Sequence, residues 1–413
     1  MTALFLTAFY AFTLSAPYSL GKLLAVALVG LWLASGRCIY KVSTWPLAYL
    51  AAVTLTTLTS ADPWLSTWGL WGTYQAGLLC ALLLIPYWAC IGPGDRAGLE
   101  RGLRWSGMLL AAVGLVQLVL ARYWPDGGIL YLLPYPLPTG MRAYSTMGSP
   151  IYVGAMGALC FPFCRNFLEK FMLCAVLLAT GSRGAWAAVA AGAIYQVWPS
   201  LTLRARVWGL LTVGAGLCAA FWMRPVSDLG RIVTWRAAWD AFMSRPWFGW
   251  GAGNYLTIAE VFRNPLWEEV YGPTTQDHAH NLFLEAAATS GLIGLAALCA
   301  MLWHLWRVSD RQVRAALLGV FFCGMLNPLP LVAKALCVAL AASCVRNSQT
   351  ENKFLSSPIR SISVILFFSV LFQVYCDRMI TFYGDTAWAF SSVKAAWHSG
   401  ILKEKISRVM FKL

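Results

Sequence analysis

The chain has 413 residues, of which 59% are hydrophobic and only 12% are charged. Soluble domains carry about 25% charged residues, so this composition excludes a soluble protein. The formal net charge of +14 would suit a nucleic-acid-binding protein, but the positions of the basic residues indicate another origin.

Apolar segments of membrane-spanning length recur along the whole chain. A bilayer crossing needs about 20 mostly apolar residues, and the segments predict an all-α polytopic membrane protein with about 12–13 transmembrane helices. The predicted crossings are 2–16, 19–36, 44–60, 73–91, 103–121, 148–164, 168–180, 184–198, 205–223, 281–306, 312–328, 329–345 and 359–376.

Lys and Arg concentrate in alternate connections between these segments. The connections around Arg101 and Arg204 are basic, whereas those near Asp62 and Gly127 are nearly free of Lys and Arg. This pattern follows the positive-inside rule and places the N-terminus in the cytoplasm. The net charge is therefore a signal of topology, and we expect no nucleic-acid partner.

One long polar segment divides the chain into four parts. These are N-terminal membrane helices (1–223), an extracytoplasmic loop (224–280), C-terminal membrane helices (281–376) and a basic tail (377–413). The helix count places the tail outside, against its charge. Either the count is wrong by one helix, or the tail crosses again through 386–402.

The loop begins with an amphipathic pattern that predicts a helix from about Ser227 to Phe242, lying on the membrane surface. Arg231 either anchors this helix at the interface or binds an anion. Arg236 either pairs with Asp240, four residues later, or binds substrate. The following glycine-rich segment, 249–255, is interpreted as a sharp turn; its alternative is a phosphate-binding loop, although it fits neither nucleotide fingerprint.

Two further arginines stand where apolar segments begin on the predicted external side. Arg183 lies in a hairpin at 179–188, where a helix starts again, and Arg142 precedes the crossing at 148–164. Unpaired N–H groups at a helix start favour anions, so both are candidate phosphate ligands. A simple interfacial anchor is the alternative for each.

The segment 278–294 carries two of the four histidines at the mouth of a predicted membrane helix. The helix dipole would keep His280 neutral, which would let it accept a proton from a hydroxyl; the alternative is a simple helix cap. His278 and Asn281 are candidate substrate-binding residues. The twelve cysteines lie in or beside apolar segments, and His-x-His with one acid is a weak zinc pattern. We therefore expect no metal and no cofactor.

These residues together describe one site outside the membrane. Arginines could neutralise a lipid-linked diphosphate as it leaves, and a neutral histidine could activate an acceptor hydroxyl. Direct displacement with inversion is the simplest scheme.

Residues 140–300 resemble the O-antigen ligase and polymerase superfamily, whose members are polytopic glycosyltransferases with a GT-C-like architecture. The resemblance rests on three motifs in order: 182–184, 230–251, and His280-Asn281-x9-Gly291-x-x-Gly294. It implies that Arg183 and Arg231 bind the undecaprenyl diphosphate of the donor and that His280 activates or positions the acceptor, without a metal. Arg142 matches a looser family pattern.

The motifs do not separate the branches of the superfamily. A ligase that joins O-antigen to lipid A-core in the bacterial inner membrane, with its site on the periplasmic side, is the leading hypothesis. A polymerase with a lipid-linked glycan acceptor follows closely, and the absence of a large soluble C-terminal domain disfavours the protein-glycosylating branch. From another class, a transporter or flippase of a lipid-linked substrate is the alternative, but no repeat supports it.

Overall fold

The computed structural model describes residues 18–36, 44–69, 76–123, 143, 145–147, 149–209, 211, 214, 225–271, 276–345 and 358–371. These residues form helices joined by turns, with no strand among them. The predicted all-α class is therefore confirmed for this part of the chain. The expected crossing at 2–16, most of 205–223, and the tail 377–413 lie outside the described residues.

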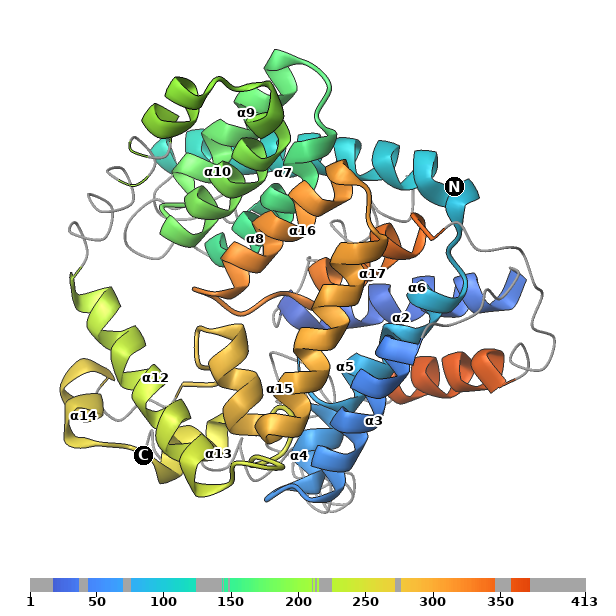
Figure 1. The fold of residues 1–413 in the computed structure, drawn as a ribbon, viewed down its shortest axis with the longest axis vertical. Coiled ribbons are helices and arrows are strands. Elements are labelled where there is room, and N and C mark those ends of the chain that lie inside the picture. The colour runs from blue at the N-terminus through green and yellow to red at the C-terminus, as the bar shows by residue number, and fades with distance from the viewer. Residues whose placement is uncertain are drawn as a thin grey trace.

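The helices follow the predicted apolar segments in order (Figure 1). Their bounds are α2 Tyr18–Gly36, α3 Thr44–Leu58, α4 Pro63–Trp68, α5 Leu78–Leu83, α6 Ile85–Ala89, α7 Arg96–Tyr123, α8 Pro150–Cys160, α9 Phe167–Ala179, α10 Arg183–Val197, α12 Pro225–Ser244, α13 Tyr255–Val261, α14 Pro265–Tyr271, α15 Leu282–Val308, α16 Arg311–Gly324 and α17 Leu331–Ala342. One more apolar helix covers Pro358–Leu371.

In the described part of the chain, two helices are long and apolar enough to cross a membrane, Pro93–Val119 and Leu282–Val308. Six shorter apolar helices of 10–17 residues accompany them there, with the adjoining α5 and α6 counted as one. The single crossing predicted at 73–91 is instead the two short helices α5 and α6, with Pro86 in the first turn of the second. Proline lacks the N–H that would continue a helix, which accounts for the interruption.

Capping side chains begin several of these helices where the sequence changes from polar to apolar. Asp62 accepts hydrogen bonds from the amides of Trp64 and Leu65 at the start of α4. Ser182, Asn281 and Asp310 accept bonds in the same way at the starts of α10, α15 and α16. Each cap pairs an amide that would otherwise lack a partner, which typically contributes about 1 kcal/mol.

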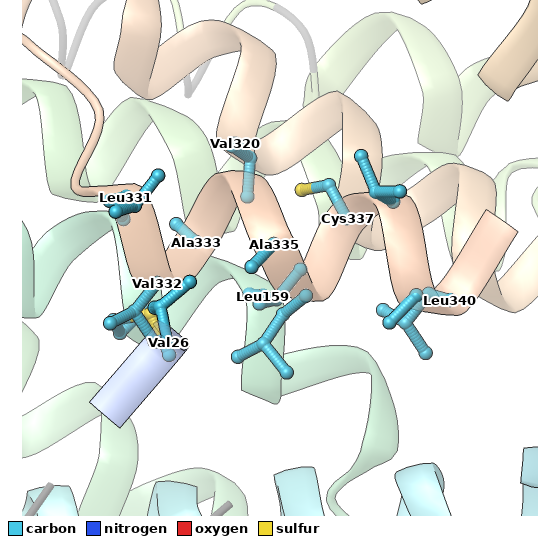
Figure 2. Close-up of a cluster of buried hydrophobic side chains, with 14 of the residues drawn as sticks. Val26, Leu159, Val320, Leu331, Val332, Ala333, Ala335, Cys337 and Leu340 are labelled. Atoms are coloured by element: carbon cyan, nitrogen blue, oxygen red, sulfur yellow. The ribbon is translucent and has the colours of Figure 1, made fainter. Parts of the chain in front are cut away.

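The main core is built around α17, which α2, α8 and α16 surround. Figure 2 shows Val26 of α2, Leu159 of α8 and Val320 of α16 against the α17 side chains. Every residue of α17 is buried except Lys334, which is half-buried. A helix that is apolar on all faces belongs in such an interior position.

The predicted loop 224–280 forms a second, smaller core against α15. The helices α12, α13 and α14 gather at one end of the molecule, opposite α7, α9 and α10 (Figure 1). Their buried side chains include Val233, Tyr255 and Trp267, which pack with Ala288 of α15. The Tyr255 hydroxyl also donates to the Thr234 carbonyl at 2.7 Å. The surface helix expected at 227–242 is thus confirmed as a helix, α12, although one side of it is covered by protein.

Candidate functional site

The histidine segment forms a tight turn that leads into α15. Asn281 is the N-cap, and its side chain accepts from the amides of Phe283 and Leu284 at 3.0 and 3.1 Å. His280 lies one residue earlier with φ 53°, a left-handed conformation that is uncommon outside glycine. The cap is therefore Asn281 and not His280, and the Asn281 side chain that was predicted to bind substrate is engaged in the cap.

The surroundings of His280 keep its ring neutral. Burial, the neighbouring His278 and the Arg231 guanidinium together lower the pKa of His280 to about 3. Its Nδ1 is buried with no hydrogen-bond partner among the described residues. A neutral ring was expected from the helix dipole; desolvation and the two nearby cationic groups are the larger causes in the structure.

His278 has a different environment, although its ring centre is only 4.3 Å from that of His280. Its Nδ1 contacts the carboxylate of Asp277. Burial acts to lower the pKa of His278, but the Asp277 carboxylate outweighs it, so that the pKa is raised overall. The pKa of Asp277 is lowered, because the pairing with His278 outweighs burial.

A partly open cavity lies beside this turn. Asp277, His278 and Glu285 line it on one side. Lys334 of α17, Asn327 and Tyr152 line it from other elements. Four ionisable groups from three segments therefore share one cavity, which is unusual in an apolar interior and typical of a functional site.

Arg231 of α12 lies close enough to His280 to lower the pKa of that ring, and it also acts on the hydroxyl of Tyr271. A Cβ on the preceding residue, Gly230, would stand 2.6 Å from the same hydroxyl, so α12 packs closely against Tyr271. The structure thus brings together Arg231 and His280, two of the three residues predicted to be catalytic. Helix α12 supplies the arginine and the start of α15 supplies the histidine.

Arg236 differs from Arg231 in exposure and partner. Its side chain is 74% exposed, and its Nε lies 3.7 Å from a carboxylate oxygen of Asp240, four residues later. The structure therefore contains the ion pair with Asp240 that was the alternative for Arg236. An exposed pair of this kind contributes little to stability.

Arg183 is the first residue of α10 and is buried, with 6% of its surface exposed. A Cβ on the next residue, Gly184, would stand 2.2 Å from Nδ2 of Asn327. Because Asn327 lines the cavity beside His278, the start of α10 borders the same region. Arg142 lies outside the described residues.

A family model described as O-antigen ligase matches residues 170–299. This match supports membership of the O-antigen ligase superfamily. The match extends from α9 into α15 and contains Arg183, Arg231 and His280, so the resemblance seen in the three motifs is confirmed for it. No curated protein matches the chain.

The glycine motifs of this O-antigen ligase segment have a structural role. Helix α15 breaks at Gly291, with φ 61° and ψ −165°. In an unbroken helix the amides of Leu292 and Ile293 would bond to the carbonyls of Ala288 and Thr289. Here the loop that follows α12 supplies all four partners.

The bonds between this loop and α15 run in both directions. The amides of Trp250 and Gly251 donate to the carbonyls of Ala288 and Thr289 at 3.1 and 2.7 Å. The amides of Leu292 and Ile293 donate to Pro246 and Trp247 at 2.7 and 3.3 Å. The amides of Trp250 and Gly251 are therefore used within the protein, which favours the turn over the phosphate-binding alternative.

The same turn is fastened to the first part of the chain. Asn254 is fully buried, and its Nδ2 donates to the Ser60 hydroxyl at 2.6 Å and to the Trp250 carbonyl at 3.0 Å. The Ala61 amide also donates to Trp250 at 3.0 Å. The connection between α3 and α4 thus holds the O-antigen ligase segment in place, although it lies outside the matched residues.

Glu285 is a residue of the site that the sequence analysis missed. Its Oε2 accepts from the amide of Ala279, between the two histidines, at 3.3 Å. The carbonyl of Ala279 accepts from the Thr234 hydroxyl of α12 at 3.4 Å. Both backbone groups of Ala279 are therefore paired, which fixes the turn. The sequence feature that could have revealed Glu285 is its place inside a predicted membrane helix, where a carboxylate is a candidate functional group by default.

Proposed function

We propose that the protein is an inverting, metal-independent membrane glycosyltransferase that moves a glycan from undecaprenyl diphosphate to an acceptor hydroxyl. Membership of residues 170–299 in the O-antigen ligase superfamily supports ligase- or polymerase-type function in general. The observation that carries the specific proposal is the approach of Arg231 to the neutral ring of His280 at the start of α15.

In this scheme Arg231 and Arg183 bind the donor diphosphate. Guanidinium groups form paired, charge-assisted hydrogen bonds with phosphate oxygens, and they stabilise the charge that grows on the diphosphate as it leaves. His280 positions or activates the acceptor hydroxyl. The hydroxyl oxygen forms a bond to the anomeric carbon, the bond from that carbon to the diphosphate oxygen breaks, and the hydroxyl proton passes to a histidine.

We further propose that the acceptor is lipid A-core and the product lipopolysaccharide, in the inner membrane of a bacterium with the site on the periplasmic side. A polymerase would use the same residues with a second lipid-linked glycan as acceptor. The polar cluster lies at the mouth of α15, which is long and apolar enough to cross a membrane, and this supports a site at a membrane surface.

A transfer assay on the purified full-length protein tests the proposal. It supplies undecaprenyl-diphosphate glycan with either lipid A-core or excess donor, in the presence of a chelator, and compares the wild type with His280→Ala. Product on lipid A-core that is lost in the variant supports the ligase. A ladder on the carrier lipid instead assigns the polymerase, and transfer that is equal in the two proteins, or absent from both, contradicts the proposal.

A further inference from the structure

The two histidines before α15 differ in what they face. His278 lines the cavity and holds the Asp277 carboxylate through Nδ1. The Nδ1 of His280 is buried and has no partner in the described part of the chain. Of the two histidines it is His278 that lines this cavity, whereas the superfamily motif begins at His280.

The pairing of His278 with Asp277 determines which ring nitrogen can react. A carboxylate on Nδ1 favours the tautomer with its proton on that nitrogen, which leaves the lone pair on Nε2. The same carboxylate stabilises the imidazolium that forms when Nε2 takes a proton. This is the arrangement by which an aspartate makes a histidine an effective general base.

We propose that His278, oriented by Asp277, accepts the proton of the acceptor hydroxyl, and that His280 positions the reacting groups without taking the proton. This inference rests on the proposed glycosyl transfer at the same site. The O–H bond of the acceptor breaks and its proton goes to Nε2 of His278. The oxygen bonds to the anomeric carbon, and the electron pair of the broken carbon–oxygen bond leaves with the diphosphate.

The charges around His278 agree with this assignment. Asp277 in the turn and Glu285 on α15 raise its pKa, against burial. Lys334 on α17 lines the same cavity, and Arg231 on α12 acts on the adjacent His280. A base works best with a pKa near the working pH, so a ring with a pKa of about 3 is a weak proton acceptor at neutral pH. The opposite shifts in the pKa values of His278 and His280 thus suit a proton acceptor and a neutral positioning residue, respectively.

The cavity also fits an uncharged, hydroxyl-bearing ring. Glu285 and Asn327 offer hydrogen-bond acceptors, and Lys334 and Asn327 offer donors. While His278 is neutral, as a base must be, two carboxylates stand against one lysine, so the cavity does not favour the anionic diphosphate. We therefore assign this cavity to the acceptor sugar, with the donor diphosphate on the side of Arg231.

The test is the pH dependence of kcat/KM for the full-length protein, with the glycan donor and the acceptor that the wild type uses. The variants are Asp277→Asn, His278→Gln and His280→Gln. The matched control is Glu260→Gln, which removes an exposed carboxylate from α13 in the same loop. Donor binding and thermal unfolding are measured for each variant.

We expect the wild-type rate to fall at acid pH as His278 becomes protonated. Asp277→Asn should lower kcat by about 10²-fold or more and move the acidic limb to lower pH, because the pKa of His278 falls. His278→Gln should remove the limb and leave donor affinity within about twofold. His280→Gln should keep the limb, and Glu260→Gln should match the wild type.

An acidic limb that persists in His278→Gln and disappears in His280→Gln overturns the inference, and so does an unchanged profile in Asp277→Asn. If His278→Gln does not fold, the profile of the nearly isosteric Asp277→Asn decides. A wild type that transfers glycan to neither acceptor overturns the proposed function itself. That outcome is distinct from an active wild type with the proton on the other histidine.

Discussion

Gly249 and Gly291 lie backbone against backbone where the loop after α12 meets the break in α15. A Cβ on Gly249 would stand 2.6 Å from the amide nitrogen of Gly291, and a Cβ on Gly291 would stand 2.3 Å from the carbonyl oxygen of Trp247. Both residues have positive φ, at 67° and 61°. Two glycines 42 positions apart in the chain therefore form one joint.

Substitution of a glycine in this joint should destabilise the protein. Gly291→Ala adds a Cβ against backbone atoms that cannot move aside and at a φ that alanine avoids, so we expect a loss of about 2 kcal/mol or more in the free energy of unfolding. Thermal unfolding in detergent measures it. The control is Gly94→Ala, because Gly94 has nothing within 4 Å of its Cβ position. Equal melting temperatures for the two variants would contradict the packing described.

Asn254 should stabilise the protein by joining the loop after α12 to the connection between α3 and α4. Asn254→Ala leaves the half-buried Ser60 hydroxyl and the Trp250 carbonyl without this donor, and each lost hydrogen bond costs about 1 kcal/mol. We expect a lower melting temperature and faster proteolysis of the 246–251 loop. Ser200→Ala, which removes a hydroxyl that bonds only within its own turn, serves as the control. Resistance to protease equal to the wild type would refute the role of Asn254.

Arg231 and Arg236 allow a matched comparison on one helix. Arg231→Ala should weaken binding of the diphosphate donor by at least about tenfold, since it removes a charge-assisted pair. Arg231→Lys should restore only part of the affinity, because lysine lacks the planar fork of donors. Arg236→Ala should leave donor affinity and transfer unchanged and cost under about 1 kcal/mol in stability. Binding of a labelled donor checks all three, and equal losses at both positions would argue against a specific site at Arg231.

Stability should decrease on acidification because of His280. Its pKa is about 3 in the folded protein, compared with 6.5 as its ordinary value. Between these values the unfolded chain binds the proton and the folded protein does not. The free energy of unfolding therefore decreases by up to about 1.4 kcal/mol per pH unit as the pH falls below about 6.5. Chemical denaturation from pH 7 to 4 should show a shallower decline in His280→Gln than in the wild type. Identical slopes would show that the ring is not desolvated.

Local patterns in the sequence predicted most of the helices. The periodicity at 227–242 gave a helix that the structure extends to Pro225–Ser244, and the apolar segment at 281–306 corresponds to α15. A single site that contains both Arg231 and His280 was also predicted, from the residue types near the ends of the apolar segments. The interruption of 73–91 was missed because hydrophobic content alone does not report where a proline ends a helix.

Contacts between distant segments could not be read from the sequence. The hydrogen bonds that join Trp250 and Gly251 to α15 are backbone bonds. They require no particular side chains, so only the glycines in this region indicate them in the sequence. The pairing of Glu285 with the Ala279 amide depends on the direction of the turn before α15. The division of roles between His278 and His280 likewise follows from burial and from Asp277, which the spacing of the motif does not encode.

The loop at 246–251 pairs the backbone groups at the break in α15, so the order in which these two segments meet matters for folding. Until the loop at 246–251 packs against α15, the carbonyls of Ala288 and Thr289 and the amides of Leu292 and Ile293 lack the partners that they have in the fold. A polar group that is buried without a partner costs about 1–3 kcal/mol. The loop precedes α15 in the chain, so its partners are already made when the helix emerges. A chain in which this loop missed the break would therefore be destabilised at one joint by four unpaired backbone groups at once.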